Sequence, residues 1–178
     1  MIRLYGIPRS RSLRVSRTLE ELGLDWQYRH INFANGDGKD PEFLAANPCA
    51  KVPALVDNGV AISESAAIVL YLAEKYGEGQ LLPKAGTAES ALHHKWISFI
   101  ISELEQPLWT MGKHKFALPE AQRLPAILPV AKWEFDKAAA IAEKWLPDSE
   151  FLLGEQFTVA DILLGHTLLW ATRFEQDL

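Results

Sequence analysis

Cysteine is almost absent from this chain, because Cys49 is the single one among 178 residues. One cysteine excludes an intramolecular disulfide, so packing and hydrogen bonds must hold the fold. The interpretation we favour for Cys49 is an incidental thiol in a loop, between Asn47-Pro48 and Lys51.

Other features are missing as well. No apolar run is long enough to span a bilayer, and Met1 leads directly into the first expected strand without a secretory leader. The formal net charge of -5 argues against nucleic acid as the main partner. His93 and His94 are adjacent and so point to different sides of a helix, which is not the spacing of metal ligands. We expect a cytoplasmic protein that binds no metal, nucleic acid or membrane.

The apolar pattern changes near Tyr76. Before it, strand-like runs alternate with helical patterns, which indicates an α/β unit, whereas the patterns after it are helical only. Gly77-Glu78-Gly79 ends a helix, and residues 81–87 are typical of a linker. We therefore expect an α/β domain at residues 1–78, a linker at 79–88 and an all-helical domain at 89–178.

Three helices are expected in the second domain. One has a long apolar face, formed by Leu92, Trp96, Phe99, Ile100 and Leu104. A second runs from about Pro119 to Trp145, with Pro125 and Pro129 near its start. The last begins at Thr158, where Thr158 and Asp161 form a capping box, and His166 lies on its apolar face as a core residue.

The turn at residues 8–12 joins the expected strand Ile2 to Tyr5 to a helix with Val15 and Leu19 on one face. Several backbone N–H groups are expected to be unpaired where a helix begins, and the positive end of its dipole favours an anion there. A thiolate qualifies as that anion, and Ser10 or Ser12 could donate one more hydrogen bond to it. The alternative is that either serine only caps the helix.

Val52-Pro53 precedes an expected strand at residues 54–56. If this peptide bond is cis, the backbone N–H and C=O of Val52 would face outward and could pair with a peptide-like ligand. The alternative is an ordinary turn, since only about one X–Pro bond in twenty is cis.

Ser63-Glu64-Ser65 follows an expected strand at residues 60–62 and begins a helix. Ser65 and the neighbouring N–H groups could hold a carboxylate, while Glu64 could accept hydrogen bonds from an ammonium group. This helix start would suit both charges of an α-amino acid. Alternatively, it is only a cap.

Taken in order along the chain, these segments resemble the glutathione transferase superfamily. The resemblance covers the whole chain, including Asn47-Pro48, and extends to the start of the last helix at residues 157–161. The turn at residues 8–12, followed by residues 19–23, most resembles the bacterial and fungal serine-type branch. The implied fold is α/β + all-α, with an N-terminal thioredoxin-like domain (a mixed four-stranded sheet and three helices) followed by a C-terminal helical bundle.

The resemblance also implies the roles of single residues. Ser10 would hydrogen-bond the sulfur of glutathione, with Ser12 as the second candidate and Tyr5 as the third. Val52 would pair through its backbone with the cysteinyl part, and Pro53 would be a cis-proline. Tyr5 is otherwise expected to be a packing residue.

Both ends of the tripeptide have implied partners. Glu64 and Ser65 would take the γ-glutamyl end. Lys39 and Lys51 would grip the glycine carboxylate, or else would be solvated surface charges.

The implied reaction is attack of the glutathione thiolate on an apolar electrophile, in a detoxifying homodimer. The expected electrophile pocket is formed by Pro8, Arg11, Trp96, Phe99, Ile100, Glu103, Pro107 and Trp109, of which the aromatic residues could equally be core. The alternatives are another glutathione-dependent enzyme (isomerase, dehalogenase or disulfide reductase) or a non-catalytic glutathione transferase-like binding protein. Because relatives usually continue past the last helix, we expect the helical domain to be truncated at Asp177-Leu178.

Overall fold

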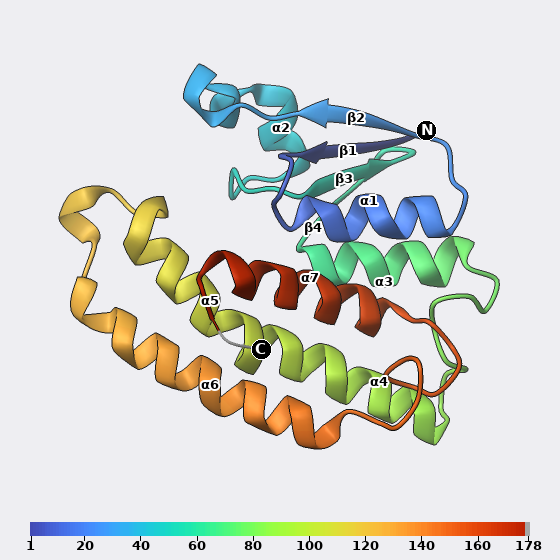
Figure 1. Ribbon diagram of the computed structural model, residues 1–178. Coiled ribbons are helices and arrows are strands. Elements are labelled where there is room, and N and C mark those ends of the chain that lie inside the picture. Colours follow the sequence, from blue (N-terminus) through green and yellow to red (C-terminus); the bar gives the residue numbers. More distant parts are fainter. Residues whose placement is uncertain (177–178) are drawn as a thin grey trace. The chain divides into compact units, whose positions relative to one another are not determined.

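The structure is a computed structural model that describes residues 1–176. The expected end of the chain at Asp177-Leu178 lies outside the described residues. The chain divides into two compact units, Met1–Pro83 and Lys84–Leu178 (Figure 1).

The first unit is a four-stranded mixed sheet with helices on both faces. Its strands are β1 (Ile2–Gly6), β2 (Trp26–His30), β3 (Ala54–Asp57) and β4 (Val60–Ser63). Their order is β2-β1-β3-β4, with β1 and β2 parallel and the other pairs antiparallel. The main helices are α1 (Ser12–Glu21), α2 (Pro41–Ala46) and α3 (Ser65–Tyr76), and short 3-10 turns occupy Phe33–Asn35 and Asp37–Lys39. Figure 1 shows α1 and α3 on one face of the sheet and α2 on the other, so the predicted thioredoxin-like domain is confirmed.

Alternating residues of β1 build the two layers of this unit. Leu4 is fully buried and lies opposite Leu55 of β3. Tyr5 belongs instead to a cluster with Phe43 of α2, with the ring centroids 5.9 Å apart, and with Ile31. The strand thus fixes on which face each of its side chains lies.

A buried carboxylate ties β3 to α3. Asp57 has no exposed surface, and its Oδ2 accepts hydrogen bonds from Tyr71 Oη, Tyr76 Oη and Lys75 Nζ, each at 2.7 Å. Burial alone would raise the pKa of Asp57, but the hydrogen bonds from Lys75, Tyr76 and Tyr71 outweigh it and hold the pKa below its usual value. The same contacts raise the pKa of Lys75. Asp57 is therefore charged at neutral pH and joins the end of a strand to a helix.

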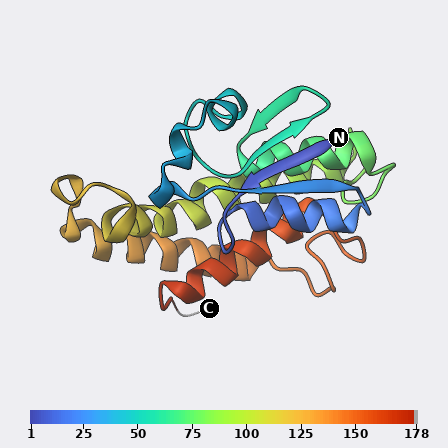
Figure 2. The same ribbon diagram turned by 90° about the horizontal axis from the view of Figure 1, so that it is seen from above.

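The second unit is helical. Its helices are α4 (Ala88–Phe99), α5 (Glu105–Gly112), α6 (Leu128–Trp145) and α7 (Val159–Arg173), with π-helical stretches at Ile100–Leu104 and Lys113–Ala117. Helices α5 and α6 pack side by side (Figure 2). The predicted helical domain is confirmed, as is the capping box of α7 at Thr158 and Asp161. Within residues 1–176, no helix combines the length and the apolar character needed to cross a membrane.

The predicted start of α6 near Pro119 is wrong. Residues from Pro119 onward form short 3-10 turns at Glu120–Gln122 and Pro125–Ile127, and α6 begins at Leu128. Proline lacks the N–H that a helix interior requires, whereas Pro129 lies in the first turn of α6, where that N–H is not needed.

The apolar face of α4 differs from the predicted one at its start. Trp96 and Phe99 are buried against Trp145, with ring centroids 5.9 and 4.7 Å from it. Leu92, in contrast, is 49% exposed, while His93 is 1% exposed. The buried face therefore runs through His93, and the prediction that included Leu92 is wrong.

His93 makes the second unit sensitive to acid. Its Nε2 has no hydrogen-bond partner among the described residues, and burial, reinforced by His94 and opposed by Asp161, lowers the pKa of His93 to about 4. In the unfolded chain His93 binds a proton near the ordinary histidine pKa of 6.5, whereas in the folded chain it does so only near about pH 4. The folded state therefore loses stability as the pH falls below 6.5. Between about pH 7 and about pH 5 we expect the free energy of unfolding to fall by about 2 kcal/mol from this group.

Urea unfolding at the two pH values tests this expectation. His93→Leu, which cannot titrate, should flatten the pH dependence, whereas His94→Leu on the exposed side of the same helix should retain most of it, because burial is the larger cause of the lowered pKa of His93. Equal slopes for the parent and His93→Leu would contradict the assignment.

Candidate functional site

The loop between β1 and α1 is held close to the end of the strand. A Cβ atom at Gly6 would lie 2.8 Å from both Cβ and Oγ of Ser12, so glycine is needed for this approach. Ser12 is 3% exposed, and its Oγ accepts a hydrogen bond from Ile7 N at 3.3 Å. Ser12 therefore belongs to the internal structure of the loop.

Ser10 is the more accessible serine of this loop. Its Oγ donates a hydrogen bond to Ile7 O at 2.7 Å, lies 2.9 Å from Ser12 Oγ, and accepts a hydrogen bond from Ser12 N at 3.2 Å. A hydroxyl has one proton, so it donates to one acceptor at a time. An incoming acceptor would therefore take the proton that Ser10 otherwise donates to Ile7 O, while Ser12 N still donates to the Ser10 oxygen.

The first amides of α1 are not free, contrary to our expectation. Leu13 N donates to Ser10 O at 3.0 Å, and Arg14 N donates to Arg11 O at 3.1 Å. The loop carbonyls fold back over the helix start and satisfy these groups, as is common at helix termini. What the loop can offer an anion is thus the hydroxyl of Ser10 rather than bare amides.

The segment before β3 has the predicted backbone. The Val52-Pro53 peptide bond is cis. The ladder between β1 and β3 ends at the pair Tyr5 and Ala54, so the half-buried Val52 lies beyond it. Asn47 holds the preceding turn by donating from Nδ2 to Lys51 O at 2.8 Å.

The start of α3 contains an unusual backbone. Glu64, between β4 and α3, has φ 68° and ψ 110°, a conformation that costs a non-glycine residue about 1–3 kcal/mol. Its side chain is exposed and does not cap the helix. Ser65 is 6% exposed, and its Oγ accepts a hydrogen bond from Arg14 Nη1 at 3.1 Å. Such strain is typical of functional positions.

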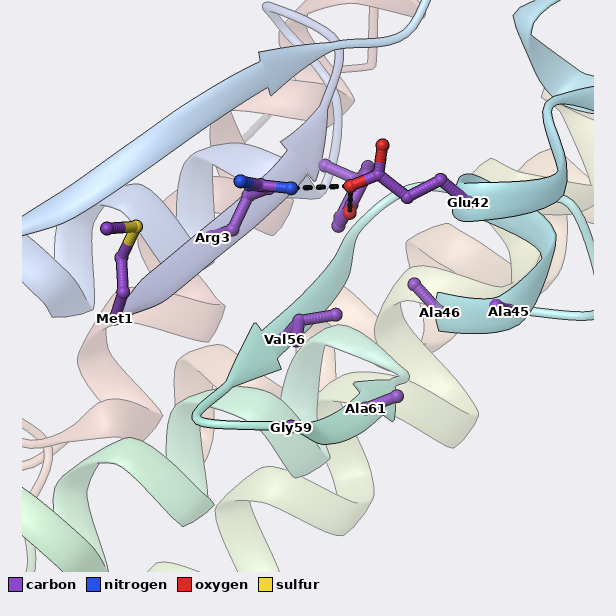
Figure 3. Close-up of a pocket in the computed structure, with 9 residues that line it drawn as sticks. Met1, Arg3, Glu42, Ala45, Ala46, Val56, Gly59 and Ala61 are labelled. Carbon is purple, nitrogen blue, oxygen red and sulfur yellow. Dashed lines mark hydrogen bonds and ion pairs between the residues drawn. The ribbon is translucent and has the colours of Figure 1, made fainter.

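Tyr5 points to the opposite side of the sheet, toward α2. It is 2% exposed, its hydroxyl donates to Glu42 Oε1 at 2.8 Å, and burial together with this bond raises its pKa. Glu42 also pairs with Arg3 (Figure 3). These residues line a cavity of about 390 Å³, together with Met1, Ala45, Ala46, Val56, Gly59 and Ala61. The hydroxyl of Tyr5 is thus engaged on the α2 face.

Lys39 and Lys51 are both exposed, the first in the turn Asp37–Lys39 and the second just before Val52. Exposed ammonium groups can reach a carboxylate or stay solvated. Among residues 1–176, no group of three or more His, Cys, Asp or Glu side chains could hold a metal ion.

The residues expected to contact an electrophile belong to two units. Pro8 is exposed and Arg11 half-buried in the first unit. In the second unit Glu103 is exposed, and the half-buried Trp109 stacks on Trp170 at 6.3 Å between ring centroids. The remaining members are buried, namely Trp96, Phe99, Ile100 and Pro107.

Sequence reasoning missed Arg14 and Gly6. Arg14 falls four residues before Thr18 and beside Val15, hence on the buried face of α1, and an arginine at such a position was a usable signal. The need for glycine at position 6 depends on the distance to Ser12, which no sequence pattern contains.

The fold and the site together define a class of protein. A β2-β1-β3-β4 mixed sheet with a cis-proline before β3, followed by a helical unit, is a thioredoxin-like domain joined to an all-α domain. The family model described as "Glutathione S-transferase, N-terminal domain" matches residues 1–74, and "Glutathione S-transferase, C-terminal domain" matches residues 106–178. The chain belongs to the glutathione S-transferase family.

Individual relatives agree with this assignment. A "Glutathione S-transferase zeta class" protein of Euphorbia esula is 35% identical, over 99% of this chain and 79% of its own length. The "Disulfide-bond oxidoreductase YfcG" of Escherichia coli is 32% identical, over 91% of this chain and 76% of its own. The crystal structure of the glutathione transferase URE2P6 from Phanerochaete chrysosporium, in complex with oxidized glutathione, superposes with a TM-score of 0.83 at 28% identity, over 99% of this chain and 81% of that one.

Proposed function

We propose that this chain binds glutathione and activates its thiol for attack on an apolar electrophile. The observation that carries the proposal is the half-buried hydroxyl of Ser10, held by Ser12 N at the end of β1. A hydroxyl donor stabilises a thiolate relative to a thiol, so the thiol ionises at lower pH. A larger thiolate fraction at neutral pH then favours nucleophilic attack.

Ser10 is our first candidate for the donor. The burial of Ser12 and its bond to Ile7 N support a structural role for that residue instead. The hydroxyl of Tyr5 is bonded to Glu42, which supports a packing role.

The remainder of the tripeptide is assigned by chemistry. Ser65 would donate to the α-carboxylate of the γ-glutamyl group, and Glu64 would accept from its ammonium group. The backbone of Val52, beyond the β1–β3 ladder, would pair with the cysteinyl part. Lys39 and Lys51 would lie near the glycine carboxylate.

For the electrophile we propose Pro8 and Arg11, which flank Ser10 in the same loop. In the helical unit the half-buried Trp109 is a better candidate than Trp96, which is packed on Trp145. We also propose that the protein acts as a homodimer in a reducing compartment such as the cytoplasm, where glutathione remains a thiol.

A second candidate is glutathione-dependent reduction of disulfides. The similarity to a disulfide-bond oxidoreductase supports it. Both activities need the same bound thiolate, so the choice of second substrate separates them. Turnover of an apolar halogenated arene, but not of a glutathione mixed disulfide, would favour conjugation, and the reverse result would favour reduction.

Titration with glutathione by calorimetry tests the proposed site. We expect the parent to bind glutathione and to ionise its thiol below the ordinary value of about 8.5. Ser65→Ala should weaken binding by about tenfold, because a carboxylate loses one hydrogen-bond donor. Ser16→Ala, which removes a hydroxyl bonded to Leu13 O on α1, is the matched control and should bind as the parent does. If the parent does not bind glutathione, both enzymatic functions are excluded.

A further inference from the structure

Arg14 is an arginine in the interior of the first unit. It is 1% exposed, and arginine is almost never fully buried unless it is paired. Its Nη1 donates to Ser65 Oγ at 3.1 Å and so joins α1 to the first residue of α3. Figure 1 shows these two helices side by side on one face of the sheet. The bond therefore reaches the start of α3 from inside the protein.

The direction of this hydrogen bond determines what Ser65 can do. A guanidinium has only donors, so Ser65 Oγ must be the acceptor. The single proton of the serine hydroxyl then cannot point at Arg14 and is left for another acceptor. A hydroxyl that accepts from a charged donor is also polarised and donates more strongly.

We propose that Arg14 is a positioning residue for the carboxylate-binding end of the glutathione site. This inference rests on the proposed function, because it assumes that Ser65 meets the α-carboxylate of the γ-glutamyl group. Arg14 orients the hydroxyl of Ser65 toward that carboxylate, and its fixed positive charge adds to the favourable field at the start of α3. Because the charge is buried, salt screens it less than a surface lysine.

The effect of Arg14 should be confined to one end of the ligand. Ser10 and Val52 reach the proposed cysteinyl part through the β1–α1 loop and the segment before β3. Losing the bond to Ser65 should therefore weaken the grip on the γ-glutamyl carboxylate and leave the ionisation of the bound thiol unchanged. A general loosening of the unit would affect both.

Two ligands and matched variants separate these effects. The variants are Arg14→Met, which removes charge and donors, Arg14→Gln, which retains a donor, and Arg17→Met on the same helix, where Arg17 is exposed and pairs with Glu21. The ligands are glutathione and its analogue lacking the γ-glutamyl α-carboxylate. We expect Arg14→Met to weaken glutathione binding by about tenfold and to weaken analogue binding by less than about twofold. The affinity of Arg14→Gln for glutathione should lie between those of Arg14→Met and the parent. Arg17→Met should match the parent.

A double-mutant cycle with Ser65→Ala measures the coupling directly. In the Ser65→Ala background, Arg14→Gln should weaken glutathione binding less than it does in the parent, since the hydroxyl that Arg14 orients is gone and only the loss of its charge remains. Circular dichroism and urea unfolding establish the folded fraction of each variant, and Arg14→Gln is used wherever Arg14→Met is not folded.

Two results would overturn the inference while leaving the proposed function intact. One is unchanged glutathione binding in a folded Arg14→Gln or Arg14→Met. The other is an equal loss for glutathione and the analogue, with no coupling to Ser65, which would make Arg14 purely structural. Failure of the parent to bind glutathione would instead remove the proposed function itself, and this inference with it.

Discussion

Replacing Ser10 by alanine is expected to lower kcat/KM for conjugation by about 100-fold, the effect of losing one donor aimed at a developing or bound anion. The loss should appear as a raised pKa of the bound thiol, because the donor stabilises the thiolate and not the thiol. Glutathione binding at low pH, where the bound thiol is protonated in both proteins, should change little, since in our proposal Val52 and Ser65 hold the remainder of the tripeptide, whereas binding at high pH should weaken. Thiolate absorbance of the complex against pH measures the shift, and Ser10→Thr, which retains a hydroxyl, should recover part of it.

Ser12→Ala is the matched comparison. Here the expected cost is in stability, about 1–2 kcal/mol, because Ile7 N loses its buried acceptor. The pKa of the bound thiol should change less than in Ser10→Ala. Normal ionisation in Ser10→Ala together with a raised thiol pKa in Ser12→Ala would transfer the role to Ser12, and an effect confined to Tyr5→Phe would transfer it to Tyr5.

Asp57→Asn is expected to destabilise the first unit by about 2 kcal/mol, because the buried carboxylate accepts three hydrogen bonds, although its ion-pair partner Lys75 is 40% exposed. The variant keeps the shape of the side chain but loses the charge that accepts from Lys75, Tyr71 and Tyr76. Urea unfolding near neutral pH measures the change. Asp136→Asn, which breaks an exposed pair with Lys132, should cost less than about 0.5 kcal/mol.

The pH dependence of this effect has a definite sign. The folded-state pKa of Asp57 is lowered, so its contribution is complete above the ordinary value of 3.8 and is lost as the pH falls below it. Parent and Asp57→Asn should therefore converge in stability below about pH 4. A difference under about 1 kcal/mol at neutral pH would show that the two tyrosines and Lys75 find equivalent partners in water.

Local patterns predicted the elements that local chemistry fixes. The strand at Ile2, the capping box at Thr158 and the helix that begins at Ser65 follow from alternation, side-chain caps and apolar spacing. The predicted start of α6 was wrong because Pro119, Pro125 and Pro129 could each stand in the first turn of a helix. Packing then determines which of them does. On α4 the boundary of the buried face also depends on which helices pack against it. For this reason His93, and not the predicted Leu92, lies on the buried face.

The site was predictable in its parts but not in its geometry. Spacing alone could not rank Ser10 and Ser12, which differ in burial and in the groups that they contact. The direction of Tyr5 depends on its register in β1 and on Glu42 of α2, which is far away in sequence. The apolar spacing of α1 was enough to place Arg14 on the buried face of that helix. Its partner Ser65 could not be predicted in this way, because it lies 51 residues later in the sequence.

The cluster of Trp96 and Phe99 around Trp145 gives the protein an optical reporter with regional selectivity. Of the six tryptophans, Trp26 is the only one in Met1–Pro83, and the other five belong to the helical unit. Intrinsic fluorescence excited selectively at tryptophan will therefore report mainly on the helical unit, with Trp26 as the one contribution from the sheet-containing unit. Acid titration followed by fluorescence and by far-ultraviolet circular dichroism can then distinguish melting that begins at His93 from melting that begins at Asp57, in one unlabelled sample.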